Sequence, residues 1–233
     1  MQTKAFSELF PLFNTANQET LEWLLSVVVE HDYPAGRAVL MEDAWGNAVY
    51  FIVSGWVKVR RLYGENSVTL AILGRGDFFG EMAILDESPR STDVVALCDV
   101  ILLSVSAQRF IQTLFKDPQL HHRMLQLMVR RLRQTNLRFQ QRHQPSVIKL
   151  ANTLVSLAES YGQPTAKGIE IFNIPYQDLA DVSDISVEDT AKIMQKLNIK
   201  GWIKIEPENQ TICLINFKQL AHLATGARLV ARG

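Results

Sequence analysis

Short β-rich runs separated by glycine constrain the fold more than any other feature of this sequence. The runs cover residues 49–53, 56–60, 68–73, 94–96 and 100–105. Glycines fall near their ends, at Gly36, Gly46, Gly55, Gly64, Gly74, Gly76 and Gly80. Many short strands joined by regular turns are typical of a β-barrel or jelly roll. The pattern alone is also compatible with an open sheet.

Residues 77–91 lie inside this strand-rich region and carry the most specific chemistry. Gly80 has no Cβ, so the backbone there can come close to a ligand. Glu81 can accept hydrogen bonds from a ribose hydroxyl, and Arg90 offers a planar fork of donors that suits a phosphate. The apolar residues 83–85 predict a short helix with free N–H groups near an anion. We therefore predict a pocket for a cyclic nucleotide, the alternative being a tight turn beside a surface ion pair.

Composition limits the other classes of function. Acids and bases balance at 24 each, so any attraction to nucleic acid or membrane has to be local. The apolar runs are too short to span a bilayer, and no secretory signal is visible at the N-terminus. Cys98 and Cys213 stand alone, which favours a reducing, cytoplasmic location. The five histidines have no metal-ligand spacing, and we expect no metal site.

A long helix is predicted over residues 117–144. Asp117 can cap it and Pro118 suits its first turn, and no glycine or proline interrupts it before Pro145. Positions spaced by three and four form a heptad seam, made of Leu125, Met128, Leu132, Thr135, Phe139 and Arg142. The seam predicts a parallel homodimer, the alternative being a helix packed on its own domain. The helix is also strongly basic, and no acid occurs from Pro118 to Ala158.

The last third of the chain, residues 145–233, has the pattern of a winged helix-turn-helix. Residues 145–161 and 174–182 are predicted to be helical, and residues 183–185 form a tight turn. Ser186 then begins a second helix, because Ser186 and Asp189 resemble a capping box. Residues 202–206 and 211–215 predict a β-hairpin. Helix, turn, helix and hairpin in this order are typical of a winged helix-turn-helix.

These features together resemble the CRP/FNR family of bacterial transcription regulators. Residues 79–84 and 89–91 are similar to the phosphate-binding cassette of cyclic-nucleotide-binding domains, F-G-E-x-A-L followed by P-R-[SAT]. Residues 128–136 resemble the family's central-helix segment. The resemblance implies an α+β fold of three parts: a cyclic-nucleotide-binding β-roll of jelly-roll type (1–116), a central dimerisation helix (117–144) and a winged helix-turn-helix domain (145–233).

The resemblance also implies a ligand and a site. Glu81 would hold the ribose hydroxyl of cAMP, while Arg90 and Ser91 would hold its cyclic phosphate. Thr135 would read the base, and Asn136, which replaces a serine of the family, would reach across from the partner subunit. The expected ligand site comprises Phe79, Gly80, Glu81, Met82, Ala83, Pro89, Arg90, Ser91, Arg131, Thr135 and Asn136. The alternative ligand is c-di-GMP, whose extra charge the arginines of the central helix could serve.

The second helix of the helix-turn-helix departs from the family pattern Ser-Arg-Glu-Thr-Val-x-Arg. Val187 replaces the first arginine and Lys192 the second, while Glu188 remains. Between residues 175 and 196 there are five acids against two lysines. This balance predicts weak or altered DNA binding, or docking on another transcription regulator. The residues expected to face DNA are Tyr176, Gln177, Ser186, Val187, Glu188 and Lys192.

Enzymatic function is not expected from this sequence. It contains no nucleophile elbow, metal triad or P-loop, and a phosphate clamp needs no chemistry. Two other branches of the resembled family fit less well. An iron–sulfur sensor needs a cysteine cluster, and a haem sensor needs an axial histidine at the pocket.

Overall fold

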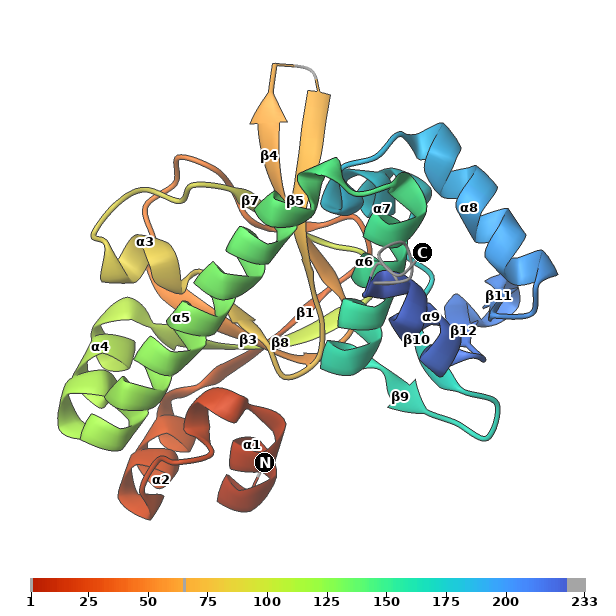
Figure 1. Cartoon of the computed structure of the whole chain (residues 1–233). Coiled ribbons are helices and arrows are strands. Elements are labelled where there is room, and N and C mark those ends of the chain that lie inside the picture. Colours follow the sequence, from red (N-terminus) through yellow and green to blue (C-terminus); the bar gives the residue numbers. More distant parts are fainter. Residues whose placement is uncertain (1, 65, 226–233) are drawn as a thin grey trace. The chain divides into compact units, whose positions relative to one another are not determined.

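A computed structural model of the chain describes residues 2–64 and 66–225 (Figure 1). The chain forms two compact units. The first comprises Met1–Ser67 and Ala71–Leu137, and the second comprises Val68–Leu70 and Arg138–Gly233. Helices are combined with sheets of antiparallel strands, which confirms the predicted α+β class. Among the described residues, no helix combines the length and the apolar character needed to cross a bilayer.

Two four-stranded sheets form the roll, with strand orders β1-β8-β3-β6 and β2-β7-β4-β5. Their strands are β1 (Val29–Tyr33), β2 (Ala38–Leu40), β3 (Ala48–Ser54), β4 (Val57–Tyr63), β5 (Asn66–Leu73), β6 (Phe78–Phe79), β7 (Asp93–Ala96) and β8 (Val100–Ser106). Neighbours in sequence are mostly not neighbours in a sheet, because the chain crosses between the two. This topology confirms the predicted roll over the open sheet.

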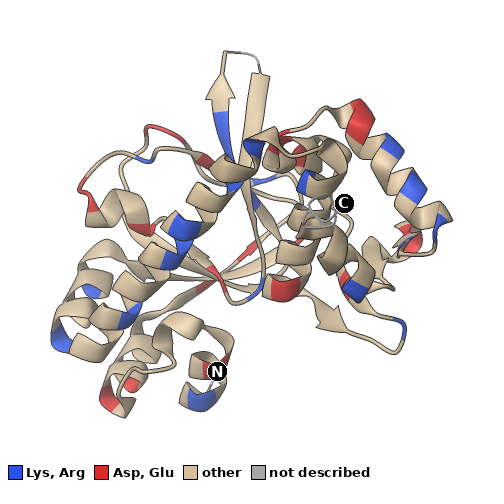
Figure 2. Cartoon of the chain, in the orientation of Figure 1, with Lys and Arg blue, Asp and Glu red and all other residues tan. Residues whose placement is uncertain are grey.

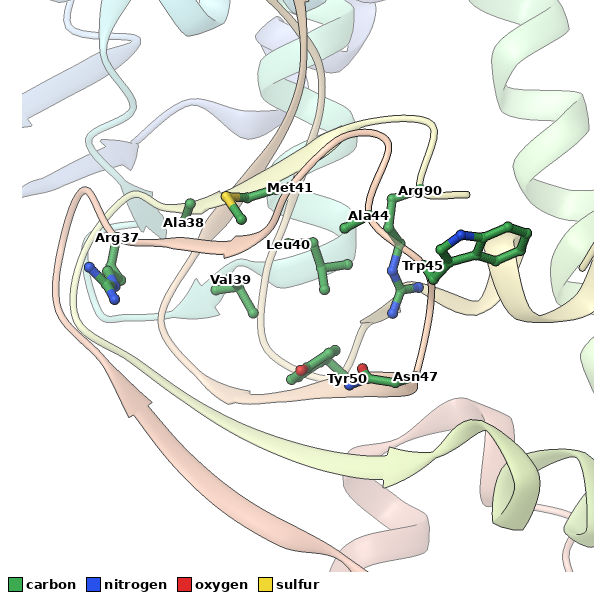
Figure 3. Close-up of a pocket in the computed structure, with 10 residues that line it drawn as sticks. All are labelled: Arg37, Ala38, Val39, Leu40, Met41, Ala44, Trp45, Asn47, Tyr50 and Arg90. Atoms are coloured by element: carbon green, nitrogen blue, oxygen red, sulfur yellow. The ribbon is translucent and has the colours of Figure 1, made fainter. Parts of the chain in front are cut away.

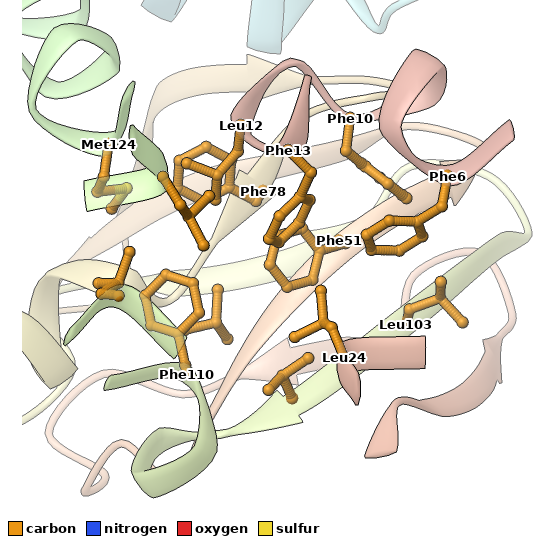
Figure 4. Close-up of a cluster of buried hydrophobic side chains, with 14 of the residues drawn as sticks. Phe6, Phe10, Leu12, Phe13, Leu24, Phe51, Phe78, Leu103, Phe110 and Met124 are labelled. Atoms are coloured by element: carbon orange, nitrogen blue, oxygen red, sulfur yellow. The ribbon is translucent and has the colours of Figure 1, made fainter. Parts of the chain in front are cut away.

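Strand β3 shows how the roll divides its core into two layers. Its residues alternate between faces, because side chains on a strand point to opposite sides. Phe51 belongs to an aromatic cluster with Phe6, Phe10 and Phe110, which fills the space between its sheet and the flanking helices (Figure 4). Ile52, the next residue, belongs to a second cluster made by residues of both sheets. The interior of the roll is therefore the second layer, and Phe79 of β6 faces it.

The helices of the first unit are α1 (Thr3–Leu9), α2 (Gln18–Val27), α3 (Glu81–Leu85), α4 (Ala107–Lys116) and α5 (Pro118–Gln140). Asp117 caps α5 as predicted, because its Oδ1 accepts from the N–H groups of Gln119 and Leu120, each at 3.1 Å. Helix α5 ends at Gln140 and a 3₁₀ turn, Gln141–His143, follows it. The predicted end at residue 144 was too late, because Pro145 limits how far a helix can run without fixing where it ends.

The second unit contains helices α6 (Ser146–Tyr161), α7 (Tyr176–Ser183), α8 (Val187–Ile199) and α9 (Phe217–Ala224). Its sheet has the order β11-β12-β10-β9, built from β9 (Gln163–Pro164), β10 (Ile169–Phe172), β11 (Ile203–Glu206) and β12 (Thr211–Leu214). Asp184 adopts a left-handed conformation at the end of α7, and Ser186 Oγ accepts from Asp189 N–H at 3.0 Å at the start of α8. The predicted helix-turn-helix and hairpin are confirmed.

Candidate functional site

The cassette residues surround the start of α3, between β6 and β7. Gly80 precedes α3 with a φ of 85°, in the left-handed region that favours glycine. A Cβ added there would lie 2.8 Å from Arg90 Nη1. The glycine therefore permits the close approach of an arginine side chain.

Glu81, the first residue of α3, is buried and paired with the central helix. Its side chain is 2 % exposed, and its Oε1 accepts from Arg131 Nη1 at 2.5 Å. Arg131 also donates from Nη2 to Asp77 Oδ1 at 2.5 Å and to the Phe78 carbonyl at 2.6 Å. Its guanidinium carbon lies 4.3 Å from the centre of the Phe78 ring. One arginine of α5 thus fixes three parts of the cassette region.

Burial and charge act in opposite directions on Glu81. Burial raises the pKa of the Glu81 carboxyl above its ordinary value, and the positive charge of Arg131 opposes that rise. A carboxylate buried this deeply needs such a partner, because an unpaired buried charge is costly. Arg131 therefore stabilises the charged form of the Glu81 carboxyl, which can accept hydrogen bonds in the interior.

Arg90 is the second buried ion of the site, with 4 % of its surface exposed. Its Nη2 donates to the Ala48 carbonyl at 2.7 Å, and its Nη1 donates to the Gly80 carbonyl. Burial lowers the pKa of Arg90, and nearby Tyr50 and Glu81 oppose that change. A guanidinium has five N–H donors, and these two bonds use two of them. Arg90 is thus held in position with donors left for an anion.

A cavity of about 440 Å³ opens beside Arg90 (Figure 3). Its walls come from β2, the loop that follows it and the start of β3. They consist of residues 37–41, Ala44, Trp45, Asn47, Tyr50 and Arg90. Of these residues, only Arg90 was predicted from the sequence. The other residues belong to no sequence motif, because the pairing of distant strands brings them to the cavity.

The other predicted ligand residues of the cassette differ in how far they are buried. Phe79 is buried, and its ring stacks on Tyr50 with centroids 5.5 Å apart. Ala83 is also buried, whereas Met82, Pro89 and Ser91 are exposed. The structure therefore joins Gly80, Glu81, Arg90 and Arg131 in one connected group and leaves the side chain of Met82 outside it.

Thr135 and Asn136 lie on the exposed part of α5. The Thr135 hydroxyl donates to the Arg131 carbonyl at 3.1 Å, one helical turn earlier. Residues four apart share a helix face, so Thr135 continues the face from which Arg131 reaches the cassette. Asn136 lies one position further round the helix.

The residues expected to face DNA belong to α7 and α8. Lys192 Nζ lies 2.6 Å from Glu188 Oε1, and both side chains are exposed. Gln177 Nε2 donates to Asp181 Oδ1 at 2.8 Å, while Val187 is exposed and Tyr176 is partly buried. Figure 2 shows acids on the first turn of α8 and lysines further along it. The basic groups of this surface are thus few and partly neutralised.

Within the described parts of the chain, no group of three or more His, Cys, Asp or Glu side chains could hold a metal ion.

Comparisons with known proteins find matches to two parts of the chain. Residues 30–117 match the model of the cyclic nucleotide-binding domain, and residues 148–223 match the Crp-like helix-turn-helix domain. The "Cyclic AMP receptor protein" of Thermus thermophilus is 29 % identical over 84 % of this chain and 89 % of its own length. The "cAMP-activated global transcriptional regulator CRP" of Salmonella typhimurium is 30 % identical over 79 % of this chain and 89 % of its own.

A solved structure of the "c-di-GMP Responsive Global Regulator CLP" from Xanthomonas campestris has the same fold. Its TM-score is 0.66 at 21 % identity, with 85 % of this chain and 99 % of that chain covered. The fold, the cassette and these matches show that the chain belongs to the CRP/FNR family of cyclic-nucleotide-binding transcription regulators. The family consists of regulators, so the chain is not an enzyme.

Proposed function

We propose that this regulator is a homodimer that binds cAMP in the roll and transmits binding to its winged-helix domain through α5. The observation that carries the proposal is the contact of Arg131 with Glu81, because it connects the cassette directly to the long helix. Ligand binding can shift a conformation only through contacts that differ between its states. A ribose that changes the Glu81–Arg131 contact supplies such a difference.

In this proposal each cassette group has a role. Glu81 holds the ribose hydroxyl, since a carboxylate has enough lone pairs to accept from both the ribose and Arg131. Arg90 and Ser91 hold the cyclic phosphate, and Thr135 reads the base. The names of the Thermus and Salmonella relatives, both of which specify cAMP, support this ligand.

Calorimetric titration of the full chain with cAMP tests the ligand. We expect saturable binding by the wild type. Thr135→Ala should lower the preference for cAMP over cGMP and leave thermal stability unchanged, because the Thr135 side chain is exposed. The absence of binding at millimolar cAMP would reject cAMP as the effector.

The dimer is proposed from the exposed seam of α5. Leu132 is 60 % exposed and Phe139 is 74 % exposed in the single chain, although both are large and apolar. Burying such side chains is worth about 1.5–3 kcal/mol each, which favours pairing of two copies. Leu132→Glu should therefore shift the protein to monomers in light scattering. Gln134→Glu adds the same charge off the seam and should leave the dimer intact, and a monomeric wild type would reject the proposal.

A second candidate ligand is c-di-GMP, the molecule to which the Xanthomonas regulator responds according to its name. The observation that favours it is the surplus of arginines on α5, because a cyclic dinucleotide carries two phosphates. Competition between labelled cAMP and unlabelled c-di-GMP distinguishes the two ligands. Displacement at low concentration supports a shared pocket.

The second unit is proposed to bind DNA weakly, or to dock on another transcription regulator. The observation that favours a protein partner is the ion pair of Lys192 with Glu188. This pair neutralises a basic group that could otherwise contact DNA phosphates. A gel-shift panel with and without ligand, run at several salt concentrations, tests this. Tight and salt-sensitive DNA binding by the protein alone would defeat the partner hypothesis.

A further inference from the structure

The segment of residues 43–48, which leads into β3, holds Arg90 by both its main chain and its side chain. The Arg90 N–H donates to the Ala44 carbonyl at 2.8 Å, and the Asp43 N–H donates to the Arg90 carbonyl at 2.9 Å. The Ala48 carbonyl accepts from Arg90 Nη2 at 2.7 Å. The guanidinium is therefore fixed in part by a segment that lies outside the cassette.

Gly46 lies in the middle of this segment, against the Arg90 guanidinium. A Cβ added at Gly46 would lie 3.1 Å from Arg90 Cζ, 3.2 Å from Arg90 Nη1 and 3.3 Å from Ala83 Cβ. Carbon atoms in ordinary van der Waals contact are about 3.5–4.0 Å apart. Figure 3 shows the two neighbours of Gly46 in sequence, Trp45 and Asn47, at the Arg90 end of the cavity. The lack of a side chain at Gly46 therefore lets this segment lie directly on the guanidinium.

The backbone itself does not require a glycine at position 46. Gly46 does not adopt the left-handed conformation, whereas Gly80 does, with a φ of 85°. An alanine could follow the same backbone path, so the nearby side chains are what limit the residue at this position. The guanidinium has little room to move aside, because Arg90 is 4 % exposed and donates to the carbonyls of Gly80 and Ala48.

We propose that Gly46 is a positioning residue for phosphate binding, which acts through Arg90 by leaving free the space that its guanidinium occupies. A side chain at Gly46 would displace the guanidinium from the carbonyls of Ala48 and Gly80. Its remaining donors would then no longer point at the phosphate, and a hydrogen bond weakens steeply when its donor is misaligned. The inference rests on the proposed role of Arg90 in binding the cyclic phosphate, and it extends the site to a residue that carries no cassette motif.

Calorimetric titrations of the full chain with cAMP and with c-di-GMP test the role of Gly46. Gly46→Ala should weaken nucleotide binding by about fivefold or more, because an extra methyl group overpacks a filled site. In the Arg90→Ala background the same change should alter affinity by less than about twofold, since the guanidinium is gone. Gly64→Ala is the matched control and should bind as the wild type does. Its added Cβ meets no atom within 4 Å, although its φ of 63° makes an alanine more strained there than at Gly46.

The outcomes separate this inference from the proposed function. Equal losses from Gly46→Ala in the wild-type and Arg90→Ala backgrounds would overturn it, because the added Cβ would then act through Ala83. Unchanged affinity in Gly46→Ala would also overturn it.

If the wild type binds neither nucleotide, the proposed function fails. In that case, or if Arg90→Ala binds too weakly to be titrated, crystal structures of the ligand-free wild type and Gly46→Ala decide the role of Gly46. A guanidinium displaced from the Ala48 or Gly80 carbonyl supports the positioning role, and an undisplaced guanidinium refutes it.

Discussion

In the roll, Glu81 and Arg90 are buried and each is fixed by hydrogen bonds, whereas in the winged-helix domain Glu188 and Lys192 of α8 face solvent. Both regions contain acids and arginines or lysines at close range. In the interior, water screens charges only weakly, so electrostatic interactions between them are stronger than on the surface. On α8, water and salt weaken the same interactions. The buried Arg90 guanidinium of the roll is therefore suited to holding a small anion.

Arg90→Ala should have the largest effect, because it removes a buried phosphate partner. We expect a loss of about 2–4 kcal/mol in cyclic-nucleotide affinity, as for truncation of a buried charged contact. The loss is measured by calorimetry against Arg75→Ala, since Arg75 is exposed on the roll and does not line the cavity. Arg90→Lys retains the charge without the planar fork and should recover only part of the affinity. Equal affinity in the wild type and Arg90→Ala would show that the pocket is elsewhere.

Arg131→Ala should come next, because it leaves the Glu81 carboxylate buried without its cation. We expect a loss of about 1–3 kcal/mol in the free energy of unfolding at neutral pH, measured by urea denaturation. Arg130→Ala, on the same helix and exposed, is the matched control. An effect of equal size in both variants would mean that the pair adds nothing to the fold.

The pH dependence of stability gives an independent check on the same pair. Burial raises the pKa of Glu81 above its ordinary value of 4.5, so the folded state holds this proton more tightly than the unfolded state. Its contribution to stability is then present below pH 4.5 and is lost as pH rises through the folded pKa. Relative to Glu81→Gln, the wild type should lose stability across that window. A wild type that gains stability there would mean that Arg131 outweighs burial.

The cassette was predictable from sequence because its order and spacing are local. Gly80, Glu81 and Arg90 are close in the chain, so a motif can identify them. Arg131 was predicted as a ligand residue, but its contact with Glu81 spans fifty residues and depends on how α5 packs. Arg37 and Asn47 belong to no motif, and they line the same cavity as Arg90 only after β2 and β3 have been placed in different sheets.

Helix boundaries show the same limit. The caps at Asp117 and Ser186 were predicted because each depends on residues two or three positions away. Helix α4 and strand β1 were not predicted. Strand β1 forms because Val29–Tyr33 pairs with β8, a partner far along the chain. Tertiary pairing of this kind overrides local periodicity.

Ser186→Ala tests a local interaction in the winged-helix domain. Its hydroxyl accepts from Asp189 N–H at 3.0 Å, and the loss of such a cap costs about 1 kcal/mol. Thermal or urea unfolding of the variant should show this loss. Ser186→Asn preserves the capping oxygen and should remain near the wild type. A cost as large as that of Arg131→Ala would mean that α8 depends on its cap as strongly as the roll depends on its buried ion pair.

Lys192→Ala should have the smallest effect on stability. The pair with Glu188 is exposed and spaced by four residues on a helix, so its removal should cost only about 0.3–0.5 kcal/mol. A double-mutant cycle with Glu188→Ala isolates this energy, and added salt should reduce it further. Lys196→Ala, also exposed on α8, controls for the loss of a lysine. A coupling energy above about 1 kcal/mol that resists salt would remove the contrast with the roll, because the α8 pair would then behave as a structural ion pair.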